Sequence, residues 1–326
     1  MERLPKSVEI KQKGIKSGTD LRKFKLNSKW SDNLQLLLIC MPALALLFVF
    51  CYLPMGGAII AFKDYQYSLG IFGSPWVGFE NFEFFFTGQD IVRIVRNTVG
   101  YAILFILLKV AVGIAIALML FEVKKVLAVK YYQTTMILPN FLSWVIVGYI
   151  SYIILSPTSG VLNQILCFFG ASEGVDWYSK VGAWPVILTI AHVWKAMGMD
   201  SVLFYAALMG LDAEVYEAAT IDGANKWQQI IRISIPLLRP ISCIVIILGM
   251  GSVFRGDFGL FYQIPRDIGI LYPVTDVIDT YIYRGMRAGT LSMSSAVGLI
   301  QSVVGLIMVV FTNSVVKRID SDSSLY

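Results

Sequence analysis

The sequence predicts an all-α integral membrane protein with six transmembrane helices. Hydrophobic residues make up 56% of the 326 residues and charged residues only 15%, against about 25% charged in ordinary soluble domains. A chain of this composition needs a lipid bilayer as its solvent. About 20 consecutive apolar residues cross the hydrocarbon core as a helix. The apolar runs that predict spans are residues 34–62, 98–121, 131–155, 182–209, 241–262 and 296–316.

Residues 1–33 form a basic tail that we expect to stay in the cytoplasm. The tail carries nine Lys or Arg, from Arg3 to Lys29, which suits the anionic inner leaflet. A solvated, disordered tail is favoured over one that binds lipid or a partner subunit. The apolar run that follows is far longer than the 7–15-residue core of a signal peptide, so we expect it to be retained as the first span.

The connections between spans set the expected orientation. The segment 63–97 is polar and aromatic, and Ile91, Val92 and Val95 predict a short amphipathic helix at the outer interface. The proposed inner segments hold 17 of the 27 Lys and Arg, against seven in the outer loops. Because basic residues favour the cytoplasmic side, both termini are expected there, including the short C-terminal tail 317–326.

Residues 211–240 are the longest polar interval between spans in the second half of the chain. Asp212 can cap a short helix with its side-chain oxygen, and Ala218 and Ala219 follow on one face of that helix. Gly223 can adopt the left-handed conformation, so we expect it to end the helix and turn the chain.

A second short helix is expected after this turn, and Pro236 and Pro240 are expected to end it. Its predicted stripe consists of Trp227, Ile230, Ile231 and Ser234. Two short helices joined at a glycine would make a compact element, and its small residues would let another protein approach closely.

Motifs for catalysis or metal binding are absent from the sequence. Cys40, Cys51, Cys167 and Cys243 show no metal-binding spacing, and His192 is the single histidine. The sequence has no phosphate-binding glycine loop and no nucleophile elbow. We therefore expect no catalytic residues, no metal site and no cofactor in this chain, and nothing suggests nucleic acid as a partner.

The 211–240 loop resembles the EAA loop of ABC-importer permeases, the cytoplasmic element that docks into the ATPase subunit. The matching residues are Glu217-Ala218-Ala219, Asp222-Gly223-Ala224, Ile233 and Pro236. Ile230 departs slightly, since the family often has Phe there. An amphipathic surface loop with a glycine turn is the simpler alternative, but the register over the full motif favours a coupling loop. The resemblance implies that Glu217, Ala218, Ala219, Asp222, Gly223 and Ala224 contact the ATPase.

Other segments look like the polysaccharide-type branch of the carbohydrate-uptake permeases. They are Gly78–Phe82, Tyr205–Leu208, Asp279–Arg284 and Ser294–Gly305. The resemblance implies that residues 34–316 have the type I ABC importer permease fold and form half of a pore in a bacterial inner membrane. It also implies a second homologous permease, so that the pore is a heterodimer, an ATPase dimer that binds ATP and Mg, and an external sugar-binding protein.

Charged residues at membrane depth are candidates for the substrate path, because each costs about 2.5 to 3.5 kcal/mol on insertion scales. The predicted lining residues are Trp194, Lys195, Arg255 and Asp257. The alternative is that the membrane charges neutralise one another as structural pairs. The two readings are even for Lys195 and Arg255, whereas a structural pair is favoured for Lys109 with Asp200, and packing for His192.

The expected function is ATP-driven import of an oligosaccharide. Lys195 and Arg255 suggest an acidic cargo such as a uronic-acid oligosaccharide, although Asp200 and Asp257 could cancel both charges. A permease for a peptide or amino acid is the alternative within the class. A membrane enzyme or a non-transporting scaffold is the alternative outside it, and no catalytic constellation supports either.

Overall fold

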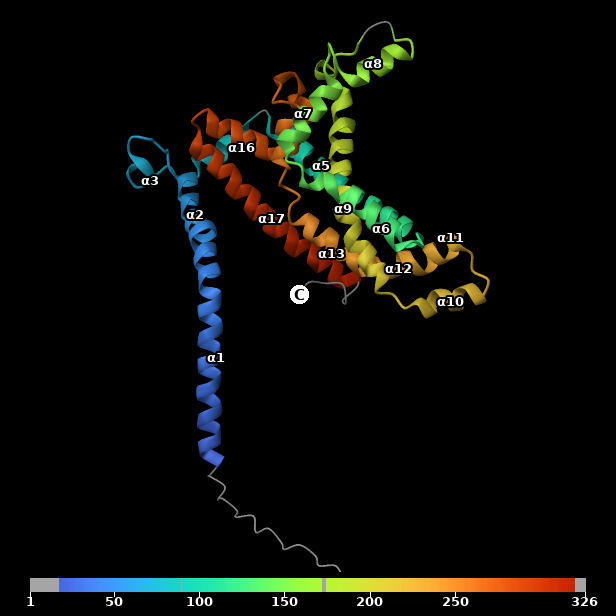
Figure 1. Ribbon diagram of the computed structural model, residues 1–326. Helices are drawn as coiled ribbons and strands as arrows, with labels where there is room; N and C mark the ends of the chain where they lie inside the picture. Colours follow the sequence, from blue (N-terminus) through green and yellow to red (C-terminus); the bar gives the residue numbers. More distant parts are fainter. Residues whose placement is uncertain (1–17, 89, 172–173, 320–326) are drawn as a thin grey trace, which may run out of the picture. The chain divides into compact units, whose positions relative to one another are not determined.

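The computed structural model describes residues 18–88, 90–171 and 174–319, and every regular element in these ranges is helical. The longer helices are α1 (Gly18–Leu47), α4 (Glu80–Thr87), α5 (Ile91–Phe121), α6 (Val126–Ile137), α7 (Trp144–Leu155), α8 (Val161–Phe168), α9 (Trp184–Met209), α10 (Ala213–Ile221), α13 (Arg239–Met250), α16 (Ile278–Arg287) and α17 (Leu291–Ile319) (Figure 1). The short α-helices are α2 (Leu53–Met55), α3 (Gly70–Gly73), α11 (Lys226–Gln229), α12 (Ile235–Leu237), α14 (Phe258–Gln263) and α15 (Tyr272–Thr275). The π and 3₁₀ turns are η1 (Phe48–Tyr52), η2 (Gly56–Phe62), η3 (Leu138–Phe141), η4 (Trp177–Ser179), η5 (Val181–Ala183), η6 (Ile230–Ser234) and η7 (Gly269–Leu271).

The chain divides into two units, residues 1–58 and 59–326. In the first unit, α1 continues through η1 into α2. The wide π turn comes just before Pro54, whose missing N–H and bulky ring disturb the regular helical ladder. α1 begins at Gly18, inside the predicted tail, and residues 1–17 lie outside the described ranges.

Among the described residues, up to six spans are present by length and composition when each bent helix pair is counted as one. The four single helices long and apolar enough to cross a membrane are Asn33–Phe62, Ile91–Phe121, Val181–Met209 and Leu291–Lys317. The bent pairs are Val126–Phe141 with Trp144–Leu155, at 97°, and Lys226–Leu237 with Arg239–Met250, at 52°. The number of spans and the helical fold class agree with the sequence prediction. The second, third and fifth spans differ from it in where they begin, bend or end.

The second span begins earlier than predicted. Residues expected to form a separate interfacial helix are the first turns of α5, so that expectation was wrong. The reason is that polar side chains here have partners inside the protein. Asn97 Nδ2 donates to the carbonyl oxygens of Pro273 and Asp276, each at 3.1 Å, and the Ile278 amide donates to Thr98 Oγ1 at 3.0 Å.

The third span is broken rather than continuous. Helix α6 passes through the 3₁₀ turn η3, which contains Pro139, and the chain restarts as α7 at a bend of 97°. Ser143 caps the new helix by accepting from the Ile146 amide at 3.4 Å. A proline, which cannot donate to the helical ladder, and a serine that can start a new helix explain the break.

The fifth span was also predicted too long at its outer end. Helix α13 ends at Met250, and an irregular segment leads to the short helix α14. Glycines at positions 249, 251 and 256 weaken a continuous helix. Asp257 then starts α14 by accepting from the Leu260 amide at 3.3 Å. Arg255 and Asp257 therefore lie outside the α13 helix.

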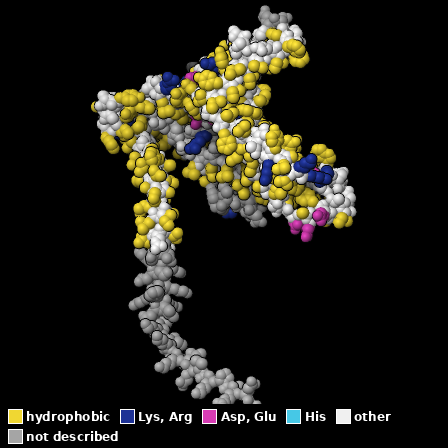
Figure 2. All heavy atoms as spheres, viewed as in Figure 1, with side chains coloured by type: hydrophobic (Ala, Val, Ile, Leu, Met, Phe, Trp, Pro, Cys, Tyr) yellow, Lys and Arg dark blue, Asp and Glu magenta, His cyan; other side chains and the backbone are white. Residues whose placement is uncertain are grey.

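The core of the second unit is built on the long contact between α5 and α9. Glycines allow close approaches here: a Cβ at Gly113 of α5 would lie 2.9 Å from the Phe204 ring of α9, and one at Gly198 of α9 would lie 2.0 Å from the Met136 carbonyl oxygen of α6. Outside this core, hydrophobic side chains cover most of the visible face, and a group of charged side chains lies at the end that carries α10 and α11 (Figure 2). Such a surface suits lipid and neighbouring membrane helices.

Candidate functional site

The 211–240 loop begins with the capped helix that the sequence predicts. The Glu214 amide donates to Asp212 Oδ1 at 3.0 Å, and α10 then runs to Ile221. Gly223 follows with φ of +81°, in the left-handed region that side chains with a Cβ rarely adopt. The glycine turn between two short helices is therefore present as expected.

The second helix of the loop differs from the prediction at its end. Asn225 and Gln228 form a capping box that starts α11, and the helix passes Pro236 to reach Leu237. Pro236 does not end it because the π turn η6, which ends at Ser234, widens the ladder one turn before the proline. Such a turn accommodates the missing N–H and the proline ring.

Hydrogen bonds between its two halves hold the 211–240 loop together. Gln229 is 4% exposed, and its Nε2 donates to Thr220 Oγ1 at 2.9 Å and to the Ala224 carbonyl oxygen at 3.3 Å. The hydroxyls of Tyr216 and Ser234 lie 2.9 Å apart. Ser234 belongs to the predicted stripe, whereas no sequence pattern marks Gln229, whose neighbours one turn away are Asn225, Lys226, Arg232 and Ile233.

The loop is also tied to the end of the second span. The rings of Phe121 and Tyr216 have centroids 5.5 Å apart, and Lys226 Nζ lies 3.0 Å from Glu122 Oε2. Both contacts reach the last residue of α5 or its immediate neighbour. Motion imposed on the loop would therefore pass directly to a membrane helix.

The residues predicted to contact an ATPase lie at the surface of this element. Glu217, Ala218, Asp222 and Gly223 are exposed, and Ala219 and Ala224 are half-buried. Two large apolar side chains flank the glycine turn, Ile221 at 86% exposed and Trp227 at 73%. Together they offer apolar side-chain surface on either side of the glycine turn. The contact itself stays a prediction.

We expect Gln229→Leu to loosen the loop without unfolding the chain. The substitution removes the donor to the carbonyl of the half-buried Ala224 and to Thr220 Oγ1, which keeps its bond to the Tyr216 carbonyl. Loss of such bonds costs about 0.5 to 1.5 kcal/mol each. Hydrogen exchange at residues 212–229 should become faster, while the amides of α9 keep their protection. Gln228→Leu, which removes a capping contact at the exposed surface, is the comparison and should have the smaller effect. Unchanged exchange in the Gln229 variant would contradict this account.

The four predicted path residues do not form one cluster. Lys195 Nζ donates to the Asn140 carbonyl oxygen at 2.8 Å, and it lies 5.2 Å from the centre of the Trp144 ring. Lys195 thus holds the backbone at the break in the third span. Trp194, the preceding residue on α9, is 37% exposed and lies on another face.

Arg255 lies near another group of polar side chains. Arg255 is exposed, and its charge acts on Asp279. Gln301 Nε2 donates to Asp279 Oδ2 at 3.1 Å, and that oxygen also accepts from the Gly256 amide. The geometry therefore gives Lys195 and Arg255 separate partners.

The structural pair favoured by the sequence is present. Lys109 Nζ lies 3.5 Å from Asp200 Oδ1, and the two side chains line a cavity of about 340 Å³ with Ser252 and several apolar residues. His192 packs with its ring stacked on Phe105 at 3.8 Å between centroids, but its buried Nδ1 has no hydrogen-bond partner among the described residues, so it is not the fully satisfied packing residue expected.

A group of aromatic side chains lies at the end of the second unit away from the 211–240 loop. The rings of Tyr152 and Tyr178 have centroids 6.0 Å apart, and Tyr178 in turn lies 5.2 Å from the ring of Trp184, the first residue of α9. Burial raises the pKa of Tyr178, in the segment before α9, to about 12. Its hydroxyl is therefore neutral at any physiological pH.

Comparison with known proteins decides the family. Residues 109–321 match the family model described as binding-protein-dependent transport system inner membrane component. The chain belongs to this family of transport permeases. The resemblance found in the sequence is therefore confirmed, and the protein is a membrane permease subunit of an ABC importer.

Several known proteins match most of this chain. Protein LplB of Bacillus subtilis (strain 168) is 35% identical over 99% of both chains. A polygalacturonan/rhamnogalacturonan transport system permease, YteP, of the same organism is 33% identical over 87% of this chain and 88% of its own. A solved bacterial ABC transporter involved in import of the acidic polysaccharide alginate matches with a TM-score of 0.81 and 31% identity, over 91% of this chain and 99% of that chain.

Proposed function

We propose that the permease forms half of the pore of an ATP-driven importer for oligosaccharides and that its 211–240 loop docks onto the ATPase. The observation that carries this proposal is the loop itself, a hydrogen-bonded element with a left-handed glycine, exposed small residues and contacts to the end of α5. A rigid element joined to a membrane helix can transmit a change of interface to the helix bundle.

The other subunits follow from the same proposal. A second, homologous permease would complete the pore as a heterodimer, and an ATPase dimer would bind ATP and Mg, since we expect no nucleotide-hydrolysing site in this chain. An external binding protein would deliver the sugar. The family description and a solved alginate transporter in complex with a periplasmic protein bound to alginate pentasaccharide support this partner.

The proposed location is a bacterial inner membrane, with both termini in the cytoplasm. The excess of Lys and Arg in the predicted inner segments supports this orientation. It places the 211–240 loop in the cytoplasm and the aromatic region around Tyr178 at the outer end of α9. We also propose that the four predicted path residues, Trp194, Lys195, Arg255 and Asp257, contact the passing sugar.

Copurification tests the proposed assembly. The permease would be tagged at its C-terminus, solubilised gently from its native membrane, and assayed for copurifying subunits and for ATP hydrolysis. We expect an ATPase and a second permease, and ATP hydrolysis that rises when a sugar-loaded binding protein is added. Recovery of the permease alone, under conditions that hold a known importer together, would contradict the proposal.

A further inference from the structure

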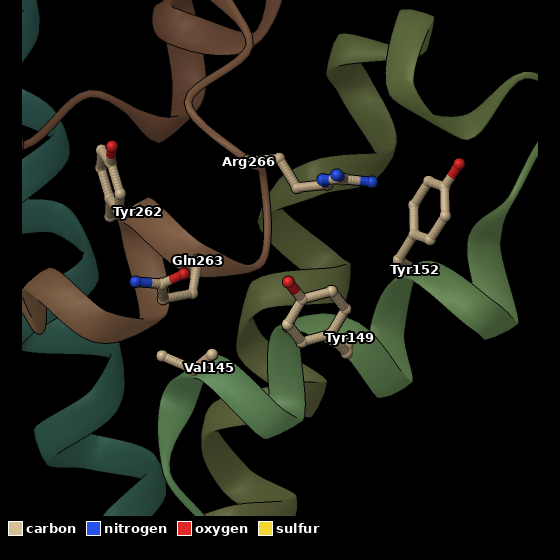
Figure 3. A pocket seen from close by; sticks show the side chains of 7 residues that line it. Val145, Tyr149, Tyr152, Tyr262, Gln263 and Arg266 are labelled. Atoms are coloured by element: carbon tan, nitrogen blue, oxygen red, sulfur yellow. The ribbon is translucent and has the colours of Figure 1, made fainter.

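A pocket at the outer end of the second unit lies between α7 on one side and the end of α14 with the turn that follows it on the other. It encloses about 230 Å³, far more than the roughly 10–15 Å³ that one water molecule needs. The lining residues are Val145, Gly148, Tyr149, Tyr152, Tyr262, Gln263 and Arg266. Figure 3 shows the side chain of Arg266 extending toward Tyr152 from the opposite wall, with Tyr149 beside them.

The backbone at Arg266 is in an unusual conformation. Arg266 has φ of 59° and Asp267 has φ of 52°, and they are the only described residues other than glycine with positive φ. Two successive residues of this kind are uncommon and persist where surrounding contacts fix them. Such backbone often marks a functional position.

The contacts of Asp267 hold this turn in place. Arg284 Nη1 lies 3.1 Å from Asp267 Oδ1, and the Tyr272 hydroxyl donates to the same oxygen at 3.1 Å. The Arg284 guanidinium in turn lies 4.2 Å from the centre of the Tyr272 ring. With Asp267 fixed on one side of the turn, Arg266 is directed to the pocket on the other.

The charge of Arg266 is available to a ligand. Its guanidinium carbon lies 4.2 Å from the centre of the Tyr152 ring, and no carboxylate of the described residues lies within 4 Å of its nitrogens. By contrast, Arg93 and Arg284 in the same outer region are each paired with carboxylates. The side chain is also exposed, so its fork of N–H donors faces open space.

We propose that this pocket binds an acidic sugar unit of the cargo, with Arg266 holding the carboxylate. The proposal rests on the function proposed above. A guanidinium binds a carboxylate through two parallel hydrogen bonds, and the Tyr152 ring keeps the guanidinium plane oriented. Tyrosine hydroxyls and the Gln263 amide are donors and acceptors suited to sugar hydroxyls, and the tyrosine faces offer apolar surface to the ring.

Uptake by the whole importer, reconstituted with its ATPase, partner permease and binding protein, tests this site. The probes are trigalacturonate and a neutral trisaccharide of galactose. We expect Arg266→Gln to lower uptake of the acidic probe at least about tenfold, as loss of a charge-assisted bidentate contact implies, and to change uptake of the neutral probe less than about twofold. Arg266→Lys, which keeps the charge, should recover part of the acidic uptake. Lys180→Gln, an exposed outer lysine that does not line the pocket, is the matched control and should change neither.

Several results would overturn the inference. With Arg266→Gln, the inference fails if uptake of both probes falls equally or if uptake of neither probe changes. It also fails if the second permease is poorly recovered with this variant, because the pocket would then be a subunit interface. Import of the neutral probe alone by the unaltered complex would reject the acidic site and leave the proposed function standing. If the unaltered complex imports neither probe and shows no ATP hydrolysis, the proposed function is rejected as well.

A second readout does not depend on the Arg266 variants. A cysteine replaces Tyr149 in a chain whose native cysteines have been substituted, and its alkylation is followed in the assembled complex. Trigalacturonate should slow this alkylation, whereas the neutral trisaccharide at the same concentration should not. Equal protection by both probes, or protection by neither, would count against the site.

Discussion

Replacing Gly223 with valine is expected to lower ATP-driven uptake at least about tenfold while the permease still reaches the membrane. Gly223 has φ of +81°, where a side chain with a Cβ costs roughly 1 to 2 kcal/mol, and a β-branched one more. Within the chain, an added Cβ would meet nothing within 4 Å. The effect would therefore arise from the turn itself or from a partner that approaches it, and membrane insertion should be unaffected. Uptake and ATPase stimulation in the reconstituted complex measure it.

Two comparison variants separate these causes. Asn tolerates the left-handed conformation better than valine, so Gly223→Asn should recover activity if backbone conformation alone matters. If close approach of the ATPase matters, Gly223→Asn should stay impaired. Gly182→Val changes a glycine that also has open space around it but has no positive φ, and it should be nearly neutral. Full activity of the Gly223→Val complex would contradict the coupling role of the loop.

Replacing Gly198 with leucine is expected to remove most folded permease from the membrane. A Cβ at this position would lie 2.0 Å from the Met136 carbonyl oxygen and 2.5 Å from the Ile137 nitrogen. Because both are backbone atoms, α9 and α6 must move apart, and overpacking of this kind costs about 1 to 3 kcal/mol or more. The amount of monodisperse protein after solubilisation, and its thermal stability, measure the loss.

The control for this variant is a glycine on the neighbouring long helix. Gly100 lies on α5, is exposed, and has nothing within 4 Å of an added Cβ. Gly100→Leu should leave the yield of folded permease almost unchanged. Equal yields for the two variants would show that the α6–α9 contact is not as close as described.

Much of the fold could be predicted from the sequence, because apolar length alone locates spans in a membrane protein. The cap at Asp212 and the turn at Gly223 were also predictable, since each depends on the chemistry of one or two neighbouring residues. The family resemblance was carried by the same local motif. These features need no knowledge of distant contacts.

Features that depend on distant contacts could not be predicted. Pro139 and Ser143 are local signals for the break in the third span, but no local pattern marks the contact of Lys195, far along the chain, with the Asn140 carbonyl at that break. The early start of α5 needs the carbonyls of Pro273 and Asp276 to receive Asn97. The Arg266 pocket combines residues of α7 with a strained turn more than 100 residues later, and no local pattern marks it.

The central claim is that the 211–240 loop contacts the ATPase, and site-specific photo-crosslinking tests it most directly. A photoreactive residue would replace Ala218, which is exposed on α10, or Phe168, which is 85% exposed on α8 at the other end of the second unit (Figure 1). In the assembled, active complex we predict that position 218 labels the ATPase subunit and position 168 does not. Absence of ATPase labelling from position 218, in a complex that still hydrolyses ATP in response to the sugar-loaded binding protein, would contradict the account.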